Sequence, residues 1–460
     1  MGTIGDPRDA LVVPSWLAQP HDPNALVPRL WSSGVVKTEP GEVTVAGVGV
    51  CELAQKFGTP TYVVDEADFR SRAADFRDAF AGCDVFYAAK AFLSVEVARW
   101  VADEGLGLDV CSAGELVCAL RAGFDPARIG FHGNNKSLTE LSRAVQTGVG
   151  RVIVDSMSEI ERLTALAAGA GVVQGVLVRV KPGVEAHTHS YIATAHEDQK
   201  FGFSFADGDA WEAMRAVEAA APLRLLGLHS HIGSQIFDTA GFDVAVRRLL
   251  ALYADGLTAG MRLGELDLGG GFGIPYTTRD DPREPADLAG SIRGVVADAC
   301  HALGIDEPRL SIEPGRAIAG LSTFTLYEVG TVKTVRLDRG DSRLYVAVDG
   351  GMSDNIRAAL YDADFSCTLA SRRSAAPATL ARVVGKHCES GDIVVKDEFL
   401  PADVRPGDLL AVPGTGAYCR SLASNYNHVP RPAVVAVRSG HARLMMRRET
   451  EDDLLRLDVP

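Results

Sequence analysis

The most informative stretch for chemistry is Phe86-Tyr87-Ala88-Ala89-Lys90-Ala91-Phe92, in which a lysine follows an apolar, strand-forming run. We expect Lys90 to lie at the carboxyl end of a strand. In a barrel of alternating strands and helices ligands bind at that end, and a partly desolvated lysine loses its proton readily enough to attack a carbonyl. Lys90 is therefore a candidate for forming a Schiff base. The alternative is a surface lysine that closes a strand.

A glycine run and an acid–arginine pair follow two later apolar runs. Leu268-Gly269-Gly270-Gly271-Phe272-Gly273 can bring backbone amides close to an anion, and loops after the seventh and eighth barrel strands often bind phosphate. Glu313-Pro314-Gly315-Arg316 places a carboxylate and a guanidinium at the same mouth as Lys90. Glu313 can face a pyridine nitrogen, and Arg316 can bind an anion through its planar fork. A tight turn and a buried ion pair are the structural alternatives.

Histidines offer two kinds of chemistry. In His229-Ser230-His231-Ile232-Gly233-Ser234, His231 can lie flat against an aromatic ring and Ser234 can donate to phosphate. The pairs His187/His189 and His229/His231 could instead each chelate zinc, as in a metal-dependent barrel hydrolase, because alternate residues of a strand point the same way. That reading leaves Lys90 and the glycine run without a role, so we expect no metal site.

The last third of the chain carries further reactive groups. Cys388-Glu389-Ser390-Gly391-Asp392 is a polar cluster with a thiol that can be reactive, and Gly416-Ala417-Tyr418 presents a phenol. Arg357 and Tyr361 lie four residues apart, one helical turn, so both can bind one carboxylate. Each of these can equally be an ordinary surface or packing residue.

Composition excludes several functions. The chain has 460 residues, a length that is typical of an enzyme with about two domains. Its formal net charge of −14 argues against a nucleic-acid partner. No apolar stretch approaches the roughly 18 residues that cross a bilayer, so we expect no membrane association. The first ten residues are charged without a hydrophobic segment, which predicts a cytoplasmic protein. Eight cysteines without a Cys-x-x-Cys pair predict free thiols.

The elements that position these groups have a regular spacing. Strand-like runs at Val85–Ala88, Gly107–Val110, Ile129–His132 and Arg151–Val154 begin 22 residues apart, which is room for one strand, one helix and two loops. Ser112, Ser137 and Ser156 each precede a glutamate by three residues, which predicts three capping boxes, and Gly123 and Gly148 predict left-handed helix ends. Four more runs follow, at Gly175–Val180, Leu225–His229, Glu265–Leu268 and Arg309–Ile312.

Eight such strands predict an α/β fold with a (β/α)8 TIM-type barrel, joined to a separate, mostly antiparallel β domain. We expect residues 1–30 to form a flexible arm, 31–57 the first part of the β domain, 58–320 the barrel and 321–460 the rest of the β domain. Thr61–Val64 would be a hinge strand that leads into the barrel. Five β-like runs, at Phe324–Val329, Leu344–Val348, Ala381–Val384, Leu409–Val412 and Ala433–Val437, support the second domain.

Taken together, these motifs resemble those of the pyridoxal-phosphate decarboxylases with the alanine-racemase-like fold, specifically the diaminopimelate decarboxylases of actinobacterial type. The resemblance runs from about Val35 to the end of the chain. It rests on Tyr87–Ala91, His132–Lys136, His229–Gln235, Gly269–Gly273, Glu313–Arg316, Asp349–Tyr361, Cys388–Asp392 and Gly416–Tyr418.

This resemblance implies a role for each candidate residue. Lys90 would hold pyridoxal 5'-phosphate covalently, and Cys388 would be the proton donor. The other cofactor contacts would be His231, Ser234, Gly270, Gly271, Glu313, Gly315, Arg316 and Tyr418. The substrate contacts would be Arg316, Arg357, Tyr361, Glu389 and Tyr418.

The reaction that the resemblance implies is decarboxylation of meso-2,6-diaminopimelate to L-lysine and carbon dioxide, in a homodimer with a site shared at the interface. An ornithine or arginine decarboxylase of the same fold is the alternative, although those substrates lack the distal carboxylate that Arg357 and Tyr361 would bind. Two positions depart from the usual family pattern. Ala358 stands where many relatives have proline and Asp362 where many have glycine, so only local loop rigidity is in question.

Overall fold

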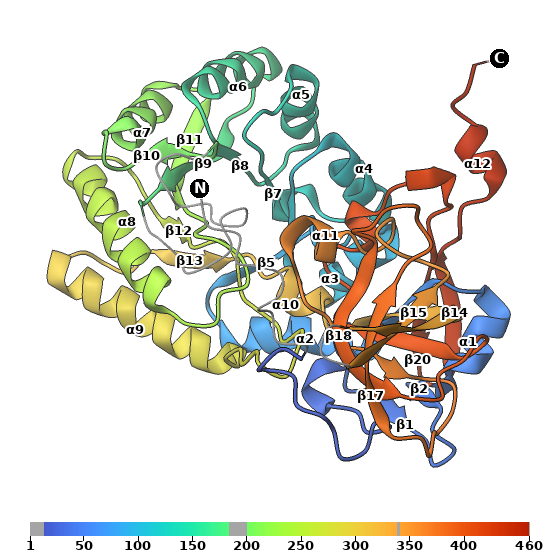
Figure 1. Ribbon diagram of the computed structural model, residues 1–460. Coiled ribbons are helices and arrows are strands. Elements are labelled where there is room, and N and C mark those ends of the chain that lie inside the picture. The colour runs from blue at the N-terminus through green and yellow to red at the C-terminus, as the bar shows by residue number, and fades with distance from the viewer. Residues whose placement is uncertain (1–12, 184–199, 338–340, 460) are drawn as a thin grey trace. The chain divides into compact units, whose positions relative to one another are not determined.

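The structure is a computed structural model that describes residues 13–183, 200–337 and 341–459 (Figure 1). It divides into two compact units. The barrel unit comprises Arg70–Gly273 and Pro282–Ile318, and the β unit comprises Met1–Phe69, Ile274–Asp281 and Ala319–Pro460, each within the described ranges. All eight cysteines are free thiols. No helix within the described ranges is long and apolar enough to cross a membrane.

Eight parallel strands close the barrel, as the sequence predicts. In order they are β5 (Asp84–Ala88), β6 (Gly107–Val110), β7 (Ile129–Phe131), β8 (Arg151–Val154), β9 (Gln174–Lys181), β11 (Leu223–His229), β12 (Glu265–Asp267) and β13 (Arg309–Ile312). Strand β13 pairs with β5 and β9 pairs with β8, so the sheet has no open edge among these strands. The two-residue strand β10 (Phe203–Ser204) adds to β9.

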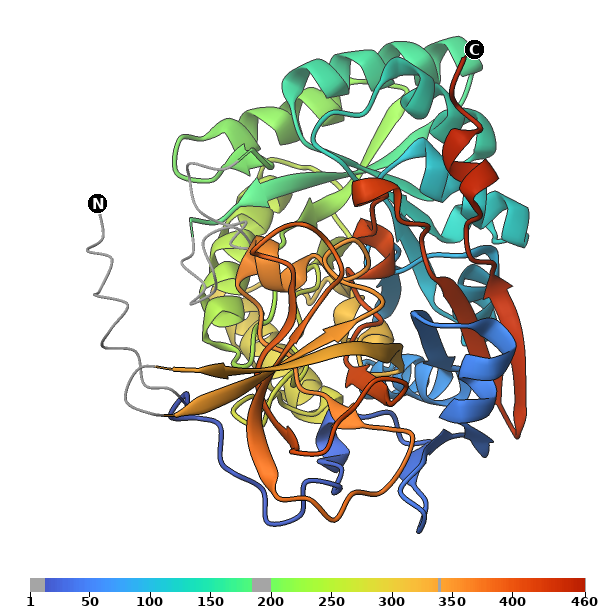
Figure 2. The same ribbon diagram turned by 45° about the vertical axis from the view of Figure 1, so that its right-hand side comes forward.

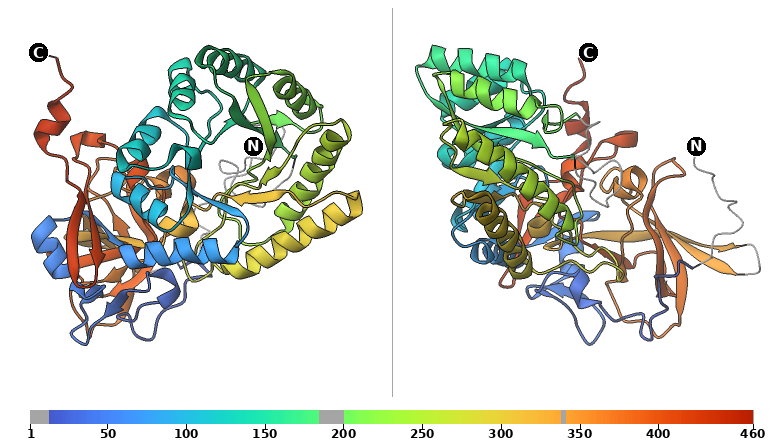
Figure 3. Two further views of the ribbon diagram at one scale, coloured as in Figure 1. Left: turned by 180° about the vertical axis from the view of Figure 1, so that it is seen from behind. Right: turned by 90° about the vertical axis from the view of Figure 1, so that its left-hand side faces the viewer.

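Helices lie on the outside of this ring, where Figure 3 shows α8 and α9 next to one another. The helix α2 (Glu66–Ala79) precedes the first barrel strand. The later helices are α3 (Val95–Asp103), α4 (Ala113–Ala122), η2 (Pro126–Arg128), α5 (Leu138–Thr147), α6 (Met157–Ala170), α7 (Asp209–Ala219), α8 (Ala240–Thr258), α9 (Pro285–Leu303) and α10 (Arg316–Ala319).

Two parts of the predicted helix caps are confirmed: the hydrogen bonds that the serine side chains accept, and the left-handed glycines at the helix ends. Ser112, Ser137 and Ser156 each accept from the backbone amide three residues on, and Gly123 and Gly148 have left-handed backbone conformations. The reciprocal bond is present at Ser137, where Glu140 accepts from the serine amide. At the other two helices the glutamate accepts from the residue before the serine, Cys111 or Asp155. The complete box was therefore predicted correctly at one position of three.

The β unit contains a mostly antiparallel sheet in the order β18-β17-β15-β14-β4-β20-β21, and β19 pairs with both β14 and β16. Its strands from β14 onwards are coloured orange to red in Figure 2. Its strands are β4 (Thr61–Asp65), β14 (Thr323–Arg336), β15 (Ser342–Val348), β16 (Thr368–Leu369), β17 (Ala378–Val384), β18 (Ile393–Pro401), β19 (Leu409–Pro413), β20 (Ala433–Arg438) and β21 (His441–Met446). A three-stranded sheet holds β1 (Val35–Lys37), β2 (Val43–Val45) and β3 (Val48–Gly49). The helices of this unit are η1 (Pro28–Leu30), α1 (Val50–Phe57), α11 (Arg357–Tyr361), η4 (Arg420–Leu422), η5 (Tyr426–His428) and α12 (Glu451–Leu455).

Strand β4 is the element whose place differs from the prediction. We expected Thr61–Val64 to lead into the barrel, but β4 is antiparallel to β14 and parallel to β20 in the β sheet. All five of its residues are buried, so it can serve as a central strand. Val63 packs in one apolar core with residues from both ends of the chain, including Val45 and Val435.

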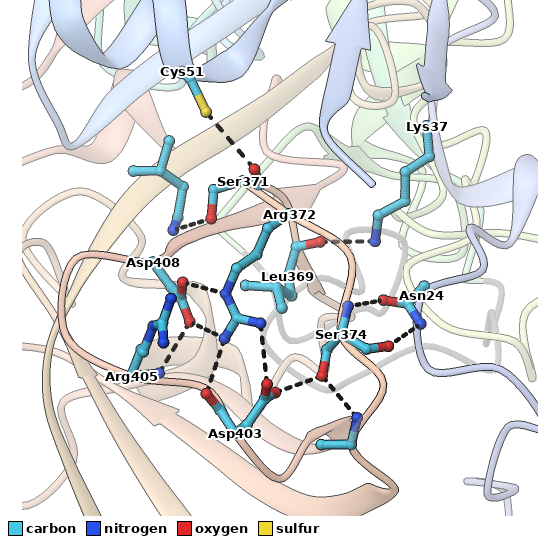
Figure 4. Close-up of polar contacts among 12 residues, drawn as sticks. Asn24, Lys37, Cys51, Leu369, Ser371, Arg372, Ser374, Asp403, Arg405 and Asp408 are labelled. Atoms are coloured by element: carbon cyan, nitrogen blue, oxygen red, sulfur yellow. Dashed lines mark hydrogen bonds and ion pairs between the residues drawn. The ribbon is translucent and has the colours of Figure 1, made fainter. Parts of the chain in front are cut away.

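The described part of the predicted N-terminal arm is tied to the β unit by side-chain hydrogen bonds. The Asn24 side chain accepts from the Ser374 amide (2.8 Å) and donates to the Ser374 carbonyl (2.9 Å). Beside it, Arg372 donates to Asp403 and Asp408, and Asp403 accepts from the Ser374 hydroxyl (Figure 4). Asn24, which lies in the segment that we predicted as a flexible arm, is thus held by two hydrogen bonds to Ser374.

Truncation of Val63 tests the position of β4. Val63→Ala removes two buried methyl groups from the shared core, so we expect the free energy of unfolding of the β unit to fall by about 2 kcal/mol. Val36→Ala is the matched control, because Val36 is 55% exposed. Urea unfolding followed by circular dichroism measures both changes, and equal losses in the two variants would contradict this position for β4.

Candidate active site

Lys90 and Glu313 line one cavity of the barrel unit. Lys90 follows β5 and Glu313 follows β13, and these two strands pair in parallel, so their carboxyl ends are neighbours. The cavity has a volume of about 290 Å³. It is lined by Ala88, Lys90, Asp109, Val110, Cys111, His132, Gly133, Asn134, Arg179, Lys200, Phe201, His229, His231 and Glu313.

The Glu313 carboxylate is buried between two imidazoles. Glu313 Oε1 lies 3.2 Å from His132 Nε2 and 3.0 Å from His229 Nε2. The two rings are arranged edge to face, with centroids 5.1 Å apart. Among the described residues this oxygen has no hydrogen-bond donor of good geometry, although the carboxylate is only 6% exposed. A buried carboxylate oxygen in that position can accept a hydrogen bond from a ligand in the cavity.

Charge in this cluster is unevenly distributed. Burial alone would raise the pKa of Glu313, but the adjacent His132 and His229 outweigh it and hold that pKa well below its usual value. Burial would lower the pKa of His132, but Glu313 and Asp109 raise it to about 10. Burial lowers the pKa of His229 despite the nearby carboxylate. At neutral pH the cluster thus holds an ionised Glu313, a protonated His132 and a neutral His229.

Two further carboxyl groups surround Glu313. Burial and the charge of Glu313 raise the pKa of Asp109 to about 6 and that of Asp267 to about 7. Asp109 lies 3.4 Å from His132 Nε2, and Asp267 accepts from the Gly269 amide at 2.9 Å. Sequence analysis gave no role to His132, Asp109 or Asp267. All three residues lie at or near the carboxyl end of a barrel strand, and this position could have indicated a role in the site.

The glycine loop after β12 packs too closely for side chains. A Cβ on Gly270 would lie 2.2 Å from the Glu313 carbonyl oxygen, and one on Gly271 would lie 2.4 Å from that of Gly233. Gly271 also has a φ of +106°. Phe272 anchors the loop by packing against Phe76 and Phe242, with ring centroids 5.4 and 5.7 Å away.

The glycine loop positions His231. A second contact joins Arg316, after β13, to Ser234, after β11. The Gly270 amide donates to His231 Nδ1 at 3.1 Å, so this amide orients the ring that lines the cavity. Burial, then the charges of Lys90 and Arg179, lower the pKa of His231 well below its usual value, which keeps the ring neutral. Arg316 Nη2 donates to Ser234 Oγ at 2.9 Å. Gly315 packs against Ala88, and a Cβ added at position 315 would lie 3.0 Å from the Ala88 side chain.

In the β unit, Arg357 lies among tyrosines. Its guanidinium carbon is 5.4 Å from the ring centre of Tyr361 and 5.7 Å from that of Tyr418. Tyr418 has a φ of +61°, which is unusual for a non-glycine residue. Asp362, where many relatives were expected to have glycine, also has a positive φ, of +53°. Lys396 donates to both its carbonyl and its carboxylate, which stabilises that conformation.

Cys388 and Glu389 lie on an exposed loop of the β unit. Asp392 holds the base of this loop by accepting from the amides of Met352 (2.6 Å) and His387 (2.7 Å). His387 Nε2 lies 2.8 Å from Ser353 Oγ, so the residue before Cys388 is fixed. Within the described residues, no hydrogen bond or ion pair joins Cys388 or Glu389 to Arg357 or Tyr361.

The alternative of a metal site at the His-x-His pairs can be compared with the structure at one pair, His229/His231. His187 and His189 lie outside the described residues. His229 approaches Glu313, whereas His231 accepts from Gly270. Ligand atoms of His132, His229 and Glu313 do lie within 4.8 Å of one another, but this set does not include His231.

The barrel fold and this site define a class of enzyme. A lysine amine, a buried ionised carboxylate, a neutral histidine ring and a tight glycine loop are the groups that fit pyridoxal 5'-phosphate, through its aldehyde, pyridine nitrogen, ring face and phosphate. The chain has the features of a barrel-type pyridoxal-phosphate enzyme. Residues 66–320 match the family model described as pyridoxal-dependent decarboxylase, pyridoxal binding domain.

The comparisons with individual proteins define the family more narrowly. The chain is 57% identical to the diaminopimelate decarboxylase of Mycobacterium tuberculosis over 94% of this chain and 98% of that protein. It is 46% identical to that of Bacillus subtilis, over 91% and 96%. The crystal structure of diaminopimelate decarboxylase from M. jannaschii in co-complex with L-lysine aligns with a TM-score of 0.86 at 30% identity, covering 93% of this chain and 98% of that one. The chain belongs to the diaminopimelate decarboxylase family.

The raised pKa of His132 gives a testable dependence of stability on pH. A pKa of about 10 in the folded state, against an ordinary 6.5, stabilises the fold fully below pH 6.5 and progressively less as pH rises towards 10. The difference in unfolding free energy between wild type and His132→Gln should therefore shrink from pH 6 to pH 10. Urea titrations at several pH values measure it, and a difference that does not vary with pH would contradict a charged His132.

Proposed function

We propose that the protein uses pyridoxal 5'-phosphate to decarboxylate meso-2,6-diaminopimelate to L-lysine and carbon dioxide, the last step of lysine biosynthesis. The observation that carries the proposal is the shared cavity of Lys90 and the ionised Glu313. Membership of the family, over nearly the whole chain, supports the same reaction.

In this proposal Lys90 holds the cofactor, and Glu313 keeps a proton on the pyridine nitrogen. When bound, pyridoxal phosphate takes up the electron pair that is left when the bond between Cα and the carboxylate breaks. Glu313 favours that step because an ionised carboxylate stabilises the protonated ring, an electrostatic effect commonly worth a few kcal/mol. His231 covers the ring face. Ser234, Gly271, Gly315 and Arg316 bind the phosphate end, while Gly270 contributes by orienting His231. Cys388 returns a proton to Cα.

Substrate recognition follows from the two amino-acid heads of meso-diaminopimelate. Arg316, Arg357 and Tyr361 bind the distal carboxylate, Glu389 binds the distal amino group, and Tyr418 contacts both cofactor and substrate. An ornithine or arginine decarboxylase would have no anion for Arg357. Its Nε atom is buried without an acceptor among the described residues, which disfavours a substrate that lacks a distal carboxylate.

We further propose a cytoplasmic homodimer in which the loop of Cys388 and Glu389 completes the site of the partner subunit. Both residues are exposed on the β unit of their own chain. An exposed loop with a well-fixed base suits a contribution to another subunit, because its reactive side chains remain available at the surface.

Substitution of Lys90 tests the cofactor role. Lys90→Ala should lose the visible absorption of covalently held cofactor and at least about 10³-fold in turnover, because no amine remains to hold the aldehyde. Lys200→Ala is the matched control, since Lys200 lines the same cavity and should keep the absorption band. A Lys90→Ala protein with the wild-type spectrum would overturn the assignment.

Mixing two inactive variants tests the shared site. Cys388→Ala should keep its colour but lose 10²- to 10⁴-fold in carbon dioxide release, as is typical when one acid is removed. If sites are shared, subunits of Lys90→Ala and Cys388→Ala that exchange will form mixed dimers with one intact site. Random exchange makes about half of the dimers mixed, and each mixed dimer has one working site of two. About a quarter of the wild-type activity should therefore return. Mixtures that exchange subunits but stay inactive would exclude sharing.

A further inference from the structure

Three tyrosine rings, not two, surround the guanidinium of Arg357. Besides Tyr361 and Tyr418, the ring centre of Tyr276 lies 5.6 Å from the guanidinium carbon. Tyr276 comes from the short segment Ile274–Asp281, which belongs to the β unit although it lies within the barrel sequence. Rings from three separate segments therefore converge on one charge.

Arg357 has a buried charge that no carboxylate of the described residues pairs. The residue is only 7% exposed. Its Nε atom is buried and has no hydrogen-bond acceptor among them. Buried charges are ordinarily paired, and aromatic faces compensate only part of the lost hydration. The guanidinium edge thus remains available for an external carboxylate, which it can bind with two parallel hydrogen bonds.

Tyr276 is the most firmly held of the three rings. It is 7% exposed, whereas Tyr361 and Tyr418 are half-buried. Its ring packs edge-on against Phe365 with centroids 5.0 Å apart, and its amide donates to Asp280 Oδ2 at 2.9 Å. Gly414 leaves room for the ring, because a Cβ there would come within 3.3 Å of it.

We propose that Tyr276 is a positioning residue for substrate specificity: its fixed ring holds the Arg357 guanidinium so that the charged edge meets the distal carboxylate of the substrate. This inference rests on the proposed function. Decarboxylation at one head of diaminopimelate leaves the other head intact, so the L-lysine product carries the carboxylate that Arg357 would bind. Cadaverine, which is lysine without its carboxylate, lacks that group. The affinity for lysine relative to cadaverine therefore reports on Arg357 without any turnover.

The test compares Tyr276→Leu with Tyr276→Phe in the cofactor-loaded protein. Dissociation constants for L-lysine and cadaverine are measured by calorimetry. Loss of one ring from a desolvated cation should weaken lysine binding about tenfold in Tyr276→Leu and leave cadaverine within about twofold. Tyr276→Phe keeps the ring, so it should lose no more than about threefold for lysine. The KM for diaminopimelate should rise about tenfold in Tyr276→Leu, with kcat changed less than about threefold.

Tyr345→Leu is the matched control. Tyr345 lies 5.8 Å from the guanidinium of Arg382 in the same unit, so this variant removes a similar contact that the proposal does not involve. Its lysine affinity should match that of wild type.

Two results would overturn the inference: an unchanged lysine affinity in Tyr276→Leu, or an equal loss for lysine and cadaverine, which would show a merely structural role. A wild-type protein that binds lysine no tighter than cadaverine and does not act on diaminopimelate would refute the proposed function instead.

Discussion

The active site depends on one buried charge, the Glu313 carboxylate. Its two imidazole neighbours, at 3.2 and 3.0 Å, stabilise that charge in a place where burial alone would protonate it. His132 carries the compensating positive charge, and His229 stays neutral. The parallel pairing of β13 with β5 then brings Lys90 to the same cavity, at the usual ligand-binding end of a barrel.

The two units differ in how they stabilise a buried charge. In the barrel unit, histidines and carboxyl groups compensate one another around Glu313. In the β unit, three aromatic rings surround Arg357, and no carboxylate of the described residues neutralises its charge. A cation surrounded in this way is suited to a ligand that brings its own anion. The nearby loop tolerates Asp362 at a positive φ because Lys396 binds the carbonyl and the carboxylate of that residue.

The sequence predicted the barrel well because its information is local. Apolar runs, serine caps and glycine ends recur along the chain, and all eight barrel strands were predicted. Features that depend on distant pairing were harder to predict. Strand β4 is as apolar as a barrel strand, and only its partners β14 and β20 show that it belongs to the β sheet. Strands β18 and β21 were missed because both are edge strands with several exposed or half-buried polar positions.

In the candidate site, too, local features could be predicted from the sequence, whereas contacts between distant residues could not. Lys90, Glu313 and the glycine run could be identified because each ends a recognisable strand. The role of His132 depends on a tertiary contact across the barrel mouth, and that of Tyr276 on a segment that leaves the barrel to join the other unit. Neither contact has a local sequence signature.

The central claim is that an ionised Glu313 keeps the pyridine nitrogen of the bound cofactor protonated. Nitrogen-15 NMR of the protein loaded with pyridoxal phosphate labelled at that nitrogen tests it most directly. The account predicts the chemical shift of a protonated pyridine in wild type and of an unprotonated one in Glu313→Gln. An unprotonated nitrogen in the wild-type protein at neutral pH would contradict it.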